Sequence, residues 1–274
     1  MPFALLAAVI GIAQERPHTV TGDVRTHAAF ESKALGNRRD ILVWLPPQYK
    51  SEPNRQFPVL YMHDGQNVFD TATSFAGEWR ADEAATGLIG ANLIEPIIIV
   101  AVPNMGVDRA NEYLPTRARN MGGKADLYGQ FLAEELKPFI DHTYRTKRGP
   151  QDTGLIGSSL GGIVTLHLGL TRPQVFGKLG VVSPSVWWDD RLMLKRVAAL
   201  PQKTPNRIWL DIGSDESRDA MKDAEDLRDA LEAKGWKNGK DLAFYLDWGA
   251  KHNEAAWSSR MGEILMFLFP AKRR

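Results

Sequence analysis

Residues 155–162 read Leu155-Ile156-Gly157-Ser158-Ser159-Leu160-Gly161-Gly162. Within this stretch, the pattern G-x-S-x-G places a glycine two residues before and two residues after Ser159. An apolar pair precedes the pattern, and a helix-like segment follows it as far as Leu170. The pattern predicts a sharp turn from a strand into a helix, where the serine has strained backbone angles and its crowded neighbours must be very small. Because such a turn pushes the hydroxyl clear of the sheet, we expect Ser159 to be a nucleophile.

A nucleophilic serine on this kind of turn needs a histidine base, which comes last in the chain order of nucleophile, acid and histidine. Of the six histidines, His252 alone lies beyond Ser159 and outside the helix that follows it. His167 lies on that helix about two turns past the serine, so its ring would point away from the hydroxyl. His252 follows the apolar run Leu242–Leu246 and precedes a helix-like segment that ends at Phe269. We therefore expect His252 to be the base.

The acid should follow an earlier buried strand, which is predicted at Arg207–Ile212. The turn after this strand, residues 213–216, contains two carboxylates. We favour Glu216 and keep Asp215 as the alternative, since the other carboxylate is explained as a charge or cap at the start of the next helix. Asp211 lies inside the strand and fits less well. The acid would hold the tautomer of the histidine and stabilise its charged form.

Five short motifs lie along the chain: Val43-Trp44-Leu45-Pro46-Pro47, Leu60-Tyr61-Met62-His63-Asp64-Gly65-Gln66-Asn67, Gly157-Ser158-Ser159-Leu160-Gly161-Gly162, Ser183-Pro184-Ser185-Val186-Trp187-Trp188 and His252-Asn253-Glu254. Through them the chain resembles the putative esterase (esterase D-like) family of α/β-hydrolases, which includes family-one carbohydrate, feruloyl and siderophore esterases. The resemblance implies one α/β-hydrolase domain at residues 19–270, with a mostly parallel central sheet, helices on both faces and no large lid. It also matches Ser159, His252 and Glu216 to the nucleophile, the base and the acid.

The loop after the apolar run Phe57–Met62 should complete the site. On a G-x-S-x-G turn, one oxyanion donor is the backbone N–H of the residue after the serine, here Leu160. The resemblance implies that the second donor is the backbone N–H of Gln66, which follows a glycine that permits a tight turn. Asp64 either shapes this loop or contacts substrate. Although His63 adjoins Asp64, adjacent residues rarely bind one ion and no third ligand is spaced nearby, so we expect no metal.

Aromatic residues in loops beyond the strands are candidates for the substrate pocket, because open α/β sheets bind ligands outside the C-terminal ends of their strands. The candidates are Tyr113, Trp187 and Trp188. The adjacent tryptophans either form a stacking wall for a sugar or an aromatic acyl group, or at least one of them packs on the core. Close to Tyr113 in the sequence, we expect Arg109 and Glu112 to form an ion pair with each other.

Apolar runs that alternate with helix-like segments predict the rest of the fold. Besides the runs named above, strands are expected at Asp40–Leu45, Ile97–Val102 and Leu179–Val182, and helices at Glu78–Ile89, at Ala125–His142 with a bend at Pro138, and at Glu216–Lys234. The alternation indicates a mostly parallel sheet with crossover helices. Since this type of fold commonly fills about 250 residues as one unit, the length of 274 residues is consistent with a single domain.

Composition argues against several other classes of function. The net charge is +1 and the only basic run is the tail at residues 272–274, so no nucleic-acid partner is expected. No phosphate-binding loop, dinucleotide fingerprint or H-E-x-x-H motif occurs, so neither a nucleotide cofactor nor zinc is expected. The absence of cysteine excludes disulfides and a thiol nucleophile.

The first residues of the chain predict a signal peptide. Residues 3–13 form an apolar run of suitable length, and Gly11-Ile12-Ala13 offers small residues at the cleavage position. We therefore predict a signal peptide at residues 1–13; because Met1-Pro2 lacks a positive side chain, a retained apolar segment is the alternative. The run is too short to span a membrane, so the mature chain is not expected to insert into one. Processing would make the protein periplasmic or secreted, and without it the protein would be cytoplasmic.

These residues together predict a serine carboxylic-ester hydrolase that acts on a small-molecule ester through an acyl-enzyme and needs no cofactor. Within the family resembled, short-acyl or hydroxycinnamoyl esters of sugars are the expected substrates, and a siderophore or another lactone is the alternative. An acyltransferase would use the same triad with an alcohol in place of water. A non-catalytic binding protein on this fold would typically have lost a triad residue, whereas all three are present here. The sequence does not set the oligomeric state.

Overall fold

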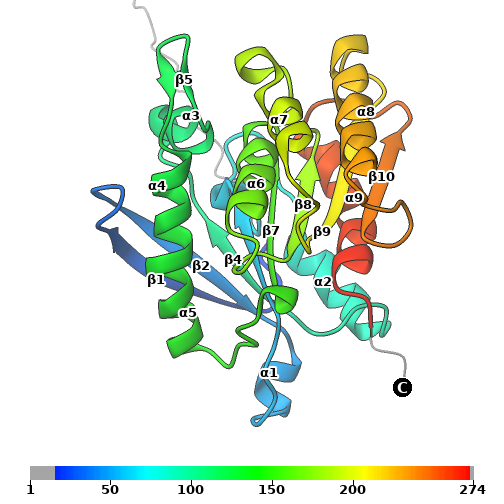
Figure 1. The fold of residues 1–274 in the computed structure, drawn as a ribbon. Helices are drawn as coiled ribbons and strands as arrows, with labels where there is room; N and C mark the ends of the chain where they lie inside the picture. The colour runs from blue at the N-terminus through cyan, green and yellow to red at the C-terminus, as the bar shows by residue number, and fades with distance from the viewer. Residues whose placement is uncertain (1–15, 272–274) are drawn as a thin grey trace, which may run out of the picture.

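The computed structural model describes residues 16–271, so the predicted signal peptide at residues 1–13 lies outside the described residues. A central sheet of eight strands runs through this part of the chain (Figure 1). In spatial order the strands are β1 (Asp23–Ser32), β2 (Asn37–Leu45), β4 (Ile98–Val102), β3 (Val59–His63), β7 (Thr153–Ser158), β8 (Lys178–Val182), β9 (Arg207–Gly213) and β10 (Leu242–Asp247). β2 pairs antiparallel with both of its neighbours, and every pair from β4 to β10 is parallel. The predicted mostly parallel α/β sheet is confirmed.

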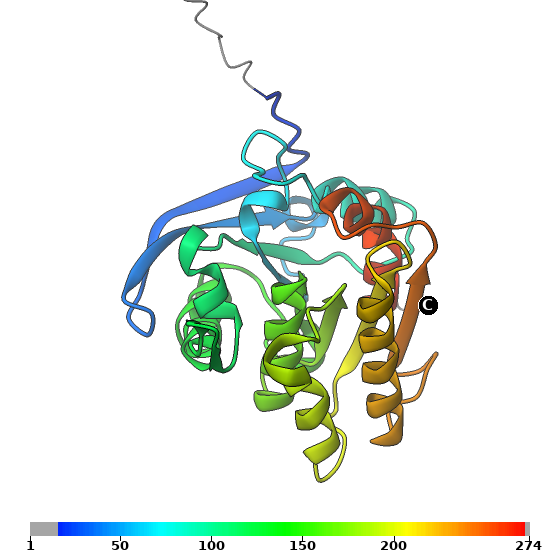
Figure 2. The same cartoon turned by 90° about the horizontal axis from the view of Figure 1, so that it is seen from above.

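Helices cover both faces of the sheet. The α-helices of the described residues are α1 (Gln48–Ser51), α2 (Ala81–Gly90), α3 (Arg109–Tyr113), α4 (Ala125–Gln130), α5 (Lys137–Thr143), α6 (Leu160–Thr171), α7 (Trp188–Ala199), α8 (Arg218–Ala233) and α9 (Glu254–Leu268). Seen from above, α2 and α9 lie on one face, and the series from α4 to α8 lies on the other (Figure 2). A short hairpin of β5 (Arg117–Ala118) and β6 (Met121–Gly122) stands between α3 and α4.

The central strands are buried on both faces, which explains their continuous apolar sequences. Every residue of β3, β4 and β7 is buried. Along β4, Ile98 and Val100 belong to the core beneath the α4–α8 face, whereas Ile99 and Ala101 belong to the core beneath α2 and α9. Because successive side chains of a strand point to opposite faces, one unbroken apolar run supplies two cores.

Six of the elements named above were not anticipated from the sequence: β1, α1, α3, β5, β6 and α7. β1 is an edge strand whose side chains are mostly exposed or half-buried, so it lacks the apolar run by which the inner strands are recognised. α7 begins at Trp188, within the segment expected to be a polar loop, and residues 189–191 have positive φ angles before the regular helix continues. The other predicted strands and helices occur, with ends that differ by a few residues.

The predicted helix at residues 125–142 consists of α4, a π-helical segment at Phe131–Leu136 and α5. Pro138 lies in the first turn of α5. A proline inside a helix removes one donor and crowds the carbonyl four residues earlier, which here belongs to Glu134. Since Glu134 lies within the π-helical segment, the disruption expected as a bend is present as a wider turn.

Candidate active site

The predicted site residues follow neighbouring strands of the sheet. β3, β7, β8, β9 and β10 are adjacent and parallel, so their C-terminal ends meet at one edge. The loops that leave these ends carry, in the same spatial order, Gln66, Ser159, Ser183, Glu216 and His252. Residues separated by almost two hundred positions in the chain are thereby brought to one region of the sheet.

The turn at Ser159 has the strained geometry that the G-x-S-x-G pattern predicts. Ser159 joins β7 to α6 with φ 59° and ψ −119°, values that a non-glycine residue seldom adopts. A β-carbon on Gly157 would lie 2.9 Å from the carbonyl carbon of Gly161 and 2.8 Å from His63 Cδ2. A β-carbon on Gly161 would meet nothing closer than 3.5 Å. The steric demand for glycine is therefore strict at Gly157 and mild at Gly161.

Ser185 contacts the candidate nucleophile, although no role was predicted for it. Its Oγ lies 3.1 Å from Ser159 Oγ, and its backbone N–H donates to the Ser159 carbonyl at 3.1 Å. Ser185 is buried, and it follows β8 in the stretch Ser183-Pro184-Ser185. That stretch was visible as a motif, but only the fold places its second serine beside Ser159.

His252 and Glu216 form a close pair. His252 Nδ1 lies 2.7 Å from Glu216 Oε2; the Glu216 side chain is 3% exposed and that of His252 is 42% exposed. Burial opposes ionisation of Glu216, but hydrogen bonds from His252, Ser183 and the Gly213 N–H outweigh it and hold the pKa of Glu216 below its ordinary value. Asp215 is exposed, and no hydrogen bond joins it to His252 within residues 16–271.

One cavity connects the candidate nucleophile with this pair. Its volume is about 470 Å³, and Ser159, His252, Glu216, Ser185 and Trp187 all contribute to its wall. Within the described chain, Ser159 Oγ is hydrogen-bonded to Ser185 and not to His252. A hydroxyl, an imidazole and an ionised carboxylate therefore share one opening, and the hydroxyl has its resting partner in a second serine.

The candidate oxyanion loop is fixed by contacts across the sheet. Gln66 lies in a single 3₁₀ turn after β3, and its side chain bonds to the backbone of Asn104 at both ends, with Nε2 donating at 2.8 Å and Oε1 accepting at 3.1 Å. Gly65 has no room for a side chain, since a β-carbon there would lie 2.5 Å from the Pro103 nitrogen. Leu160 is the first residue of α6, so its N–H has no acceptor within the helix.

Asp64 supports this loop from a buried position. Its Oδ1 accepts hydrogen bonds from Arg109 Nε at 2.6 Å and from Asn104 Nδ2 at 2.7 Å, and its Oδ2 accepts from Arg109 Nη2 at 2.8 Å. The predicted ion pair between Arg109 and Glu112 is wrong, because Arg109 binds Asp64 while Glu112 forms a buried pair with Arg39 at 2.7 Å. Both carboxylate oxygens are thus engaged by protein groups, which favours the loop-shaping role of Asp64 over contact with substrate.

The three aromatic candidates for the pocket differ in exposure. Trp187 is 49% exposed, lines the cavity of Ser159 and has the Arg119 guanidinium 5.8 Å from its ring centre. Trp188 is buried in the core, which agrees with the alternative that at least one of the two tryptophans packs there. Tyr113 is fully buried, and its hydroxyl accepts a hydrogen bond from the Asp64 N–H at 3.1 Å. Of these three, Trp187 alone lines the cavity of Ser159, whereas Tyr113 and Trp188 are buried away from it, so their placement in the pocket wall is corrected.

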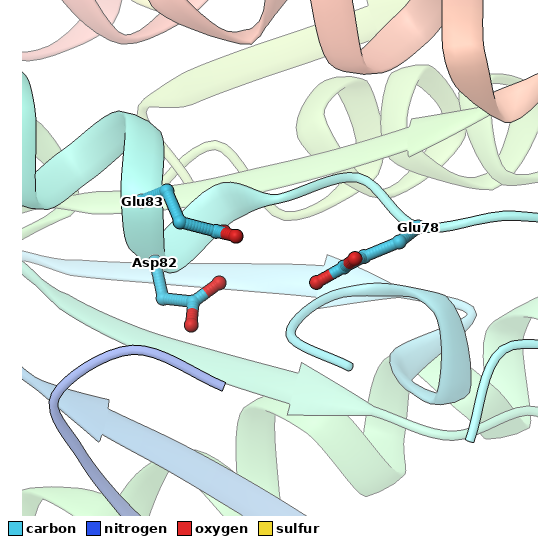
Figure 3. Close-up of side chains that lie close together, drawn as sticks. All are labelled: Glu78, Asp82 and Glu83. Carbon is cyan, nitrogen blue, oxygen red and sulfur yellow. The ribbon is translucent and has the colours of Figure 1, made fainter. Parts of the chain in front are cut away.

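A cluster of acidic side chains lies outside this site. Oxygen atoms of Glu78, Asp82 and Glu83 lie within 4.8 Å of one another (Figure 3). Glu78 accepts hydrogen bonds from two threonine hydroxyls at 2.9 and 2.6 Å, and Asp82 Oδ2 accepts from the Thr21 N–H at 2.6 Å. Burial, with Glu83 adding to it, raises the pKa of Asp82 to about 7, so this carboxyl retains a proton in mildly acidic solution. Through the hydrogen bond from the Thr21 N–H to Asp82, the cluster joins the segment before β1 to α2.

Known proteins resemble this chain along most of its length. The model of the family described as "Putative esterase" matches residues 32–268. The ferri-bacillibactin esterase BesA of Bacillus subtilis is 28% identical over 80% of this chain and 81% of its own length. An endo-1,4-beta-xylanase/feruloyl esterase of Xylanibacter ruminicola is 25% identical over 88% of this chain and 30% of its own length. The crystal structure of the BES protein from Bacillus cereus shares the fold, with a TM-score of 0.73 at 23% identity, covering 94% of this chain and 99% of that one.

Proposed function

The chain belongs to the putative esterase family and is a carboxylic-ester hydrolase, and from that premise we propose that it acts through Ser159, His252 and Glu216 by way of an acyl-enzyme. One observation carries this proposal. His252 Nδ1 and Glu216 Oε2 lie 2.7 Å apart in the wall of the same cavity as the strained Ser159. Asp215, the alternative acid, is exposed and supports the proposal less well.

The first half of the reaction forms the acyl-enzyme. Ser159 Oγ exchanges its resting partner Ser185 for His252 Nε2, which accepts the hydroxyl proton as the oxygen attacks the ester carbonyl. Glu216 keeps Nδ1 protonated and stabilises the imidazolium that results. The backbone N–H groups of Gln66 and Leu160 are the proposed donors to the tetrahedral oxyanion. The intermediate collapses, and the alcohol leaves with the proton that His252 returns to it.

The second half of the reaction releases the acid. Water enters the cavity and gives a proton to His252 as its oxygen attacks the acyl carbonyl. The second tetrahedral intermediate collapses, and Ser159 recovers its proton from His252. Ester and water are thereby converted to acid and alcohol, and no other reactant is consumed.

The proposed substrates are short-acyl or hydroxycinnamoyl esters of sugars. The cavity of about 470 Å³ has room for a small acyl group, and the exposed Trp187 ring offers a face on which a sugar or a phenyl ring stacks. The match to a feruloyl esterase supports this class. A siderophore ester is the second candidate, because the ferri-bacillibactin esterase is similar over most of both chains.

The test is steady-state hydrolysis of p-nitrophenyl esters of increasing acyl length by the wild type and by S159A. We expect the variant to lose roughly 10⁴-fold or more in kcat, since the nucleophile is absent. Feruloyl sugars and a tricatecholate trilactone, offered at equal concentration, would separate the two substrate classes by kcat/KM. Equal rates for the two proteins would exclude Ser159 as the nucleophile.

We also propose that residues 1–13 are removed and that residues 19–270 work as one catalytic domain in the periplasm or outside the cell. The described residues, 16–271, contain no helix with the length and apolar character that crossing a membrane requires. The mass of the protein recovered from the cell envelope or the medium tests cleavage near Ala13. An intact N-terminus on an intracellular product would contradict it.

A further inference from the structure

Ser183 lies behind the proposed acid and has a fully determined hydrogen-bonding environment. It is buried, and its Oγ lies 2.5 Å from Glu216 Oε1, 2.9 Å from Arg260 Nη2 and 3.0 Å from Trp257 Nε1. A hydroxyl has one proton to donate and two lone pairs that accept. Because arginine and tryptophan side chains can only donate, they occupy the two lone pairs, and the Ser183 proton must point to Glu216.

The hydrogen bond from Ser183 helps to fix the orientation of the Glu216 carboxylate. Its Oε1 accepts from the Ser183 hydroxyl and, at 3.0 Å, from the Gly213 N–H, while its Oε2 faces His252 Nδ1. Two donors on one oxygen fix the plane of the carboxylate, so the other oxygen is left in line with the imidazole. The hydrogen bond also favours the ionised form of Glu216, which is the form that orients a histidine.

The groups behind Ser183 are themselves held in place. Arg260 is buried and lies 3.2 Å from Asp211 Oδ1 and 3.0 Å from Asp247 Oδ2. The Ser183 N–H donates to Asp211 Oδ1 at 3.0 Å. The rings of Trp257 and His252 are nearly perpendicular, at 87°, with their centres 5.0 Å apart. The network therefore contacts both members of the pair, through Ser183 to Glu216 and through Trp257 to His252.

We propose that Ser183 is a positioning residue for Glu216: its hydroxyl, directed by Arg260 and Trp257, fixes the carboxylate in the orientation that His252 requires. This inference rests on the proposed function, because it assumes that Glu216 acts through His252. Ser183 lies in the wall of the cavity, but its hydroxyl is engaged by Glu216, Arg260 and Trp257 and, within the described residues, makes no hydrogen bond to Ser159 or His252. Its loss should therefore lower the rate of the chemical step and leave substrate binding unchanged.

Two variants test the role of the hydroxyl. S183A removes it and keeps the left-handed backbone at φ 40°, whereas S183G removes it and relieves that conformation. We expect both to lower kcat by about tenfold, the worth of a hydrogen bond to a charged group, with KM changed less than twofold. If S183A does not fold, S183G still reports on the hydroxyl. Wild-type kcat in S183G would overturn the inference.

A double-mutant comparison separates positioning from general damage. Because Ser183 acts through Glu216, S183A should cost about tenfold in the wild type and nothing further in the E216Q background. An equal loss in both backgrounds would overturn the inference. The matched control is S32A, which deletes another buried serine hydroxyl that donates to a glutamate, Ser32 Oγ to Glu135 Oε2 at 2.8 Å, and should leave kcat unchanged.

The proposed function and this inference can fail separately. An S159A variant with the wild-type rate would overturn the proposed function and, with it, the role of Ser183. An inactive S159A variant together with S183A and S183G variants at the wild-type kcat would overturn the inference alone.

Discussion

A β-carbon on Gly157 would lie 2.9 Å from the carbonyl carbon of Gly161, while a β-carbon on Gly161 would have no neighbour closer than Asp64 Oδ2, at 3.5 Å. The two glycines of the G-x-S-x-G pattern are thus unequal. The first is required because the backbone of α6 passes directly over it. The second lies in ordinary contact distance of its neighbours, so a methyl group fits there.

This asymmetry predicts opposite effects of two similar substitutions. G157A should lower the free energy of unfolding by about 1–3 kcal/mol, because overpacking a rigid site forces the backbone to move. G161A should leave it unchanged or raise it by roughly 0.5–1 kcal/mol, since alanine is the better helix former. Urea unfolding of both variants and the wild type measures the difference. Equal losses in the two variants would contradict the inferred crowding.

Substitution of the two carboxylates after β9 distinguishes the candidate acids. E216Q should lower kcat by roughly 10²–10⁴-fold, because an amide cannot stabilise the imidazolium. D215N, the matched control on the adjacent and exposed residue, should stay within about twofold of the wild type. Both rates are measured on the same p-nitrophenyl ester at saturating substrate. The reverse ranking would make Asp215 the acid.

The acidic cluster at the start of α2 predicts a pH dependence of stability. Burial raises the pKa of Asp82 to about 7 in the folded protein, whereas an unfolded chain ionises this group near its ordinary value of about 3.9. The folded state therefore binds more protons between these values, so this contribution to stability is complete below about pH 4 and is lost as the pH rises to about 7.

The substitution D82N removes that titration. Its asparagine still accepts from the Thr21 N–H and has an amide donor for Glu83. We expect the free energy of unfolding of D82N to exceed that of the wild type at pH 8 and the difference to shrink at pH 4. Urea titrations at several pH values measure this, with the exposed Asp229 as a D229N control. A difference independent of pH would show that Asp82 does not titrate in this range.

The adjacent tryptophans predict contrasting phenotypes. W187A should raise KM for hydroxycinnamoyl esters severalfold with a small change in kcat, because the ring is 49% exposed in the cavity wall. W188A should cost about 3–5 kcal/mol of stability, since it empties a buried position. Michaelis–Menten kinetics and thermal unfolding of both variants test the pair. A W187A variant with unchanged KM for every aryl ester would remove Trp187 from the pocket.

The sequence predicted those features of the fold that depend on residues close together in the chain. The turn at Ser159 follows from two glycines and the change from strand to helix, and the inner strands follow from apolar runs that need burial on both faces. β1 was not predicted because an edge strand carries few apolar residues. Such a strand is defined by the hydrogen bonds of its neighbour, which no short window of sequence contains.

The ion-pair partners of buried charged residues could not be predicted from the sequence for a different reason. Arg109 lies three residues from Glu112, yet it binds Asp64 across the sheet, and Glu112 binds Arg39. The directed hydroxyl of Ser183 likewise depends on groups that are far away in the chain. Spacing along the sequence shows only which charges are close on one helix. The tertiary fold decides which oppositely charged side chain, often distant in the sequence, lies within ion-pair distance.

Three non-glycine residues at this edge of the sheet have positive φ angles: Asp64 at 55°, Ser159 at 59° and Ser183 at 40°. They follow the adjacent strands β3, β7 and β8. Each such conformation costs about 1–3 kcal/mol and persists because the surroundings enforce it. Laboratory selection for heat tolerance alone should therefore enrich glycine at these positions and yield sturdier proteins with poorer catalysis. Any effort to raise the thermal stability of this protein should therefore measure catalytic turnover in every variant it selects.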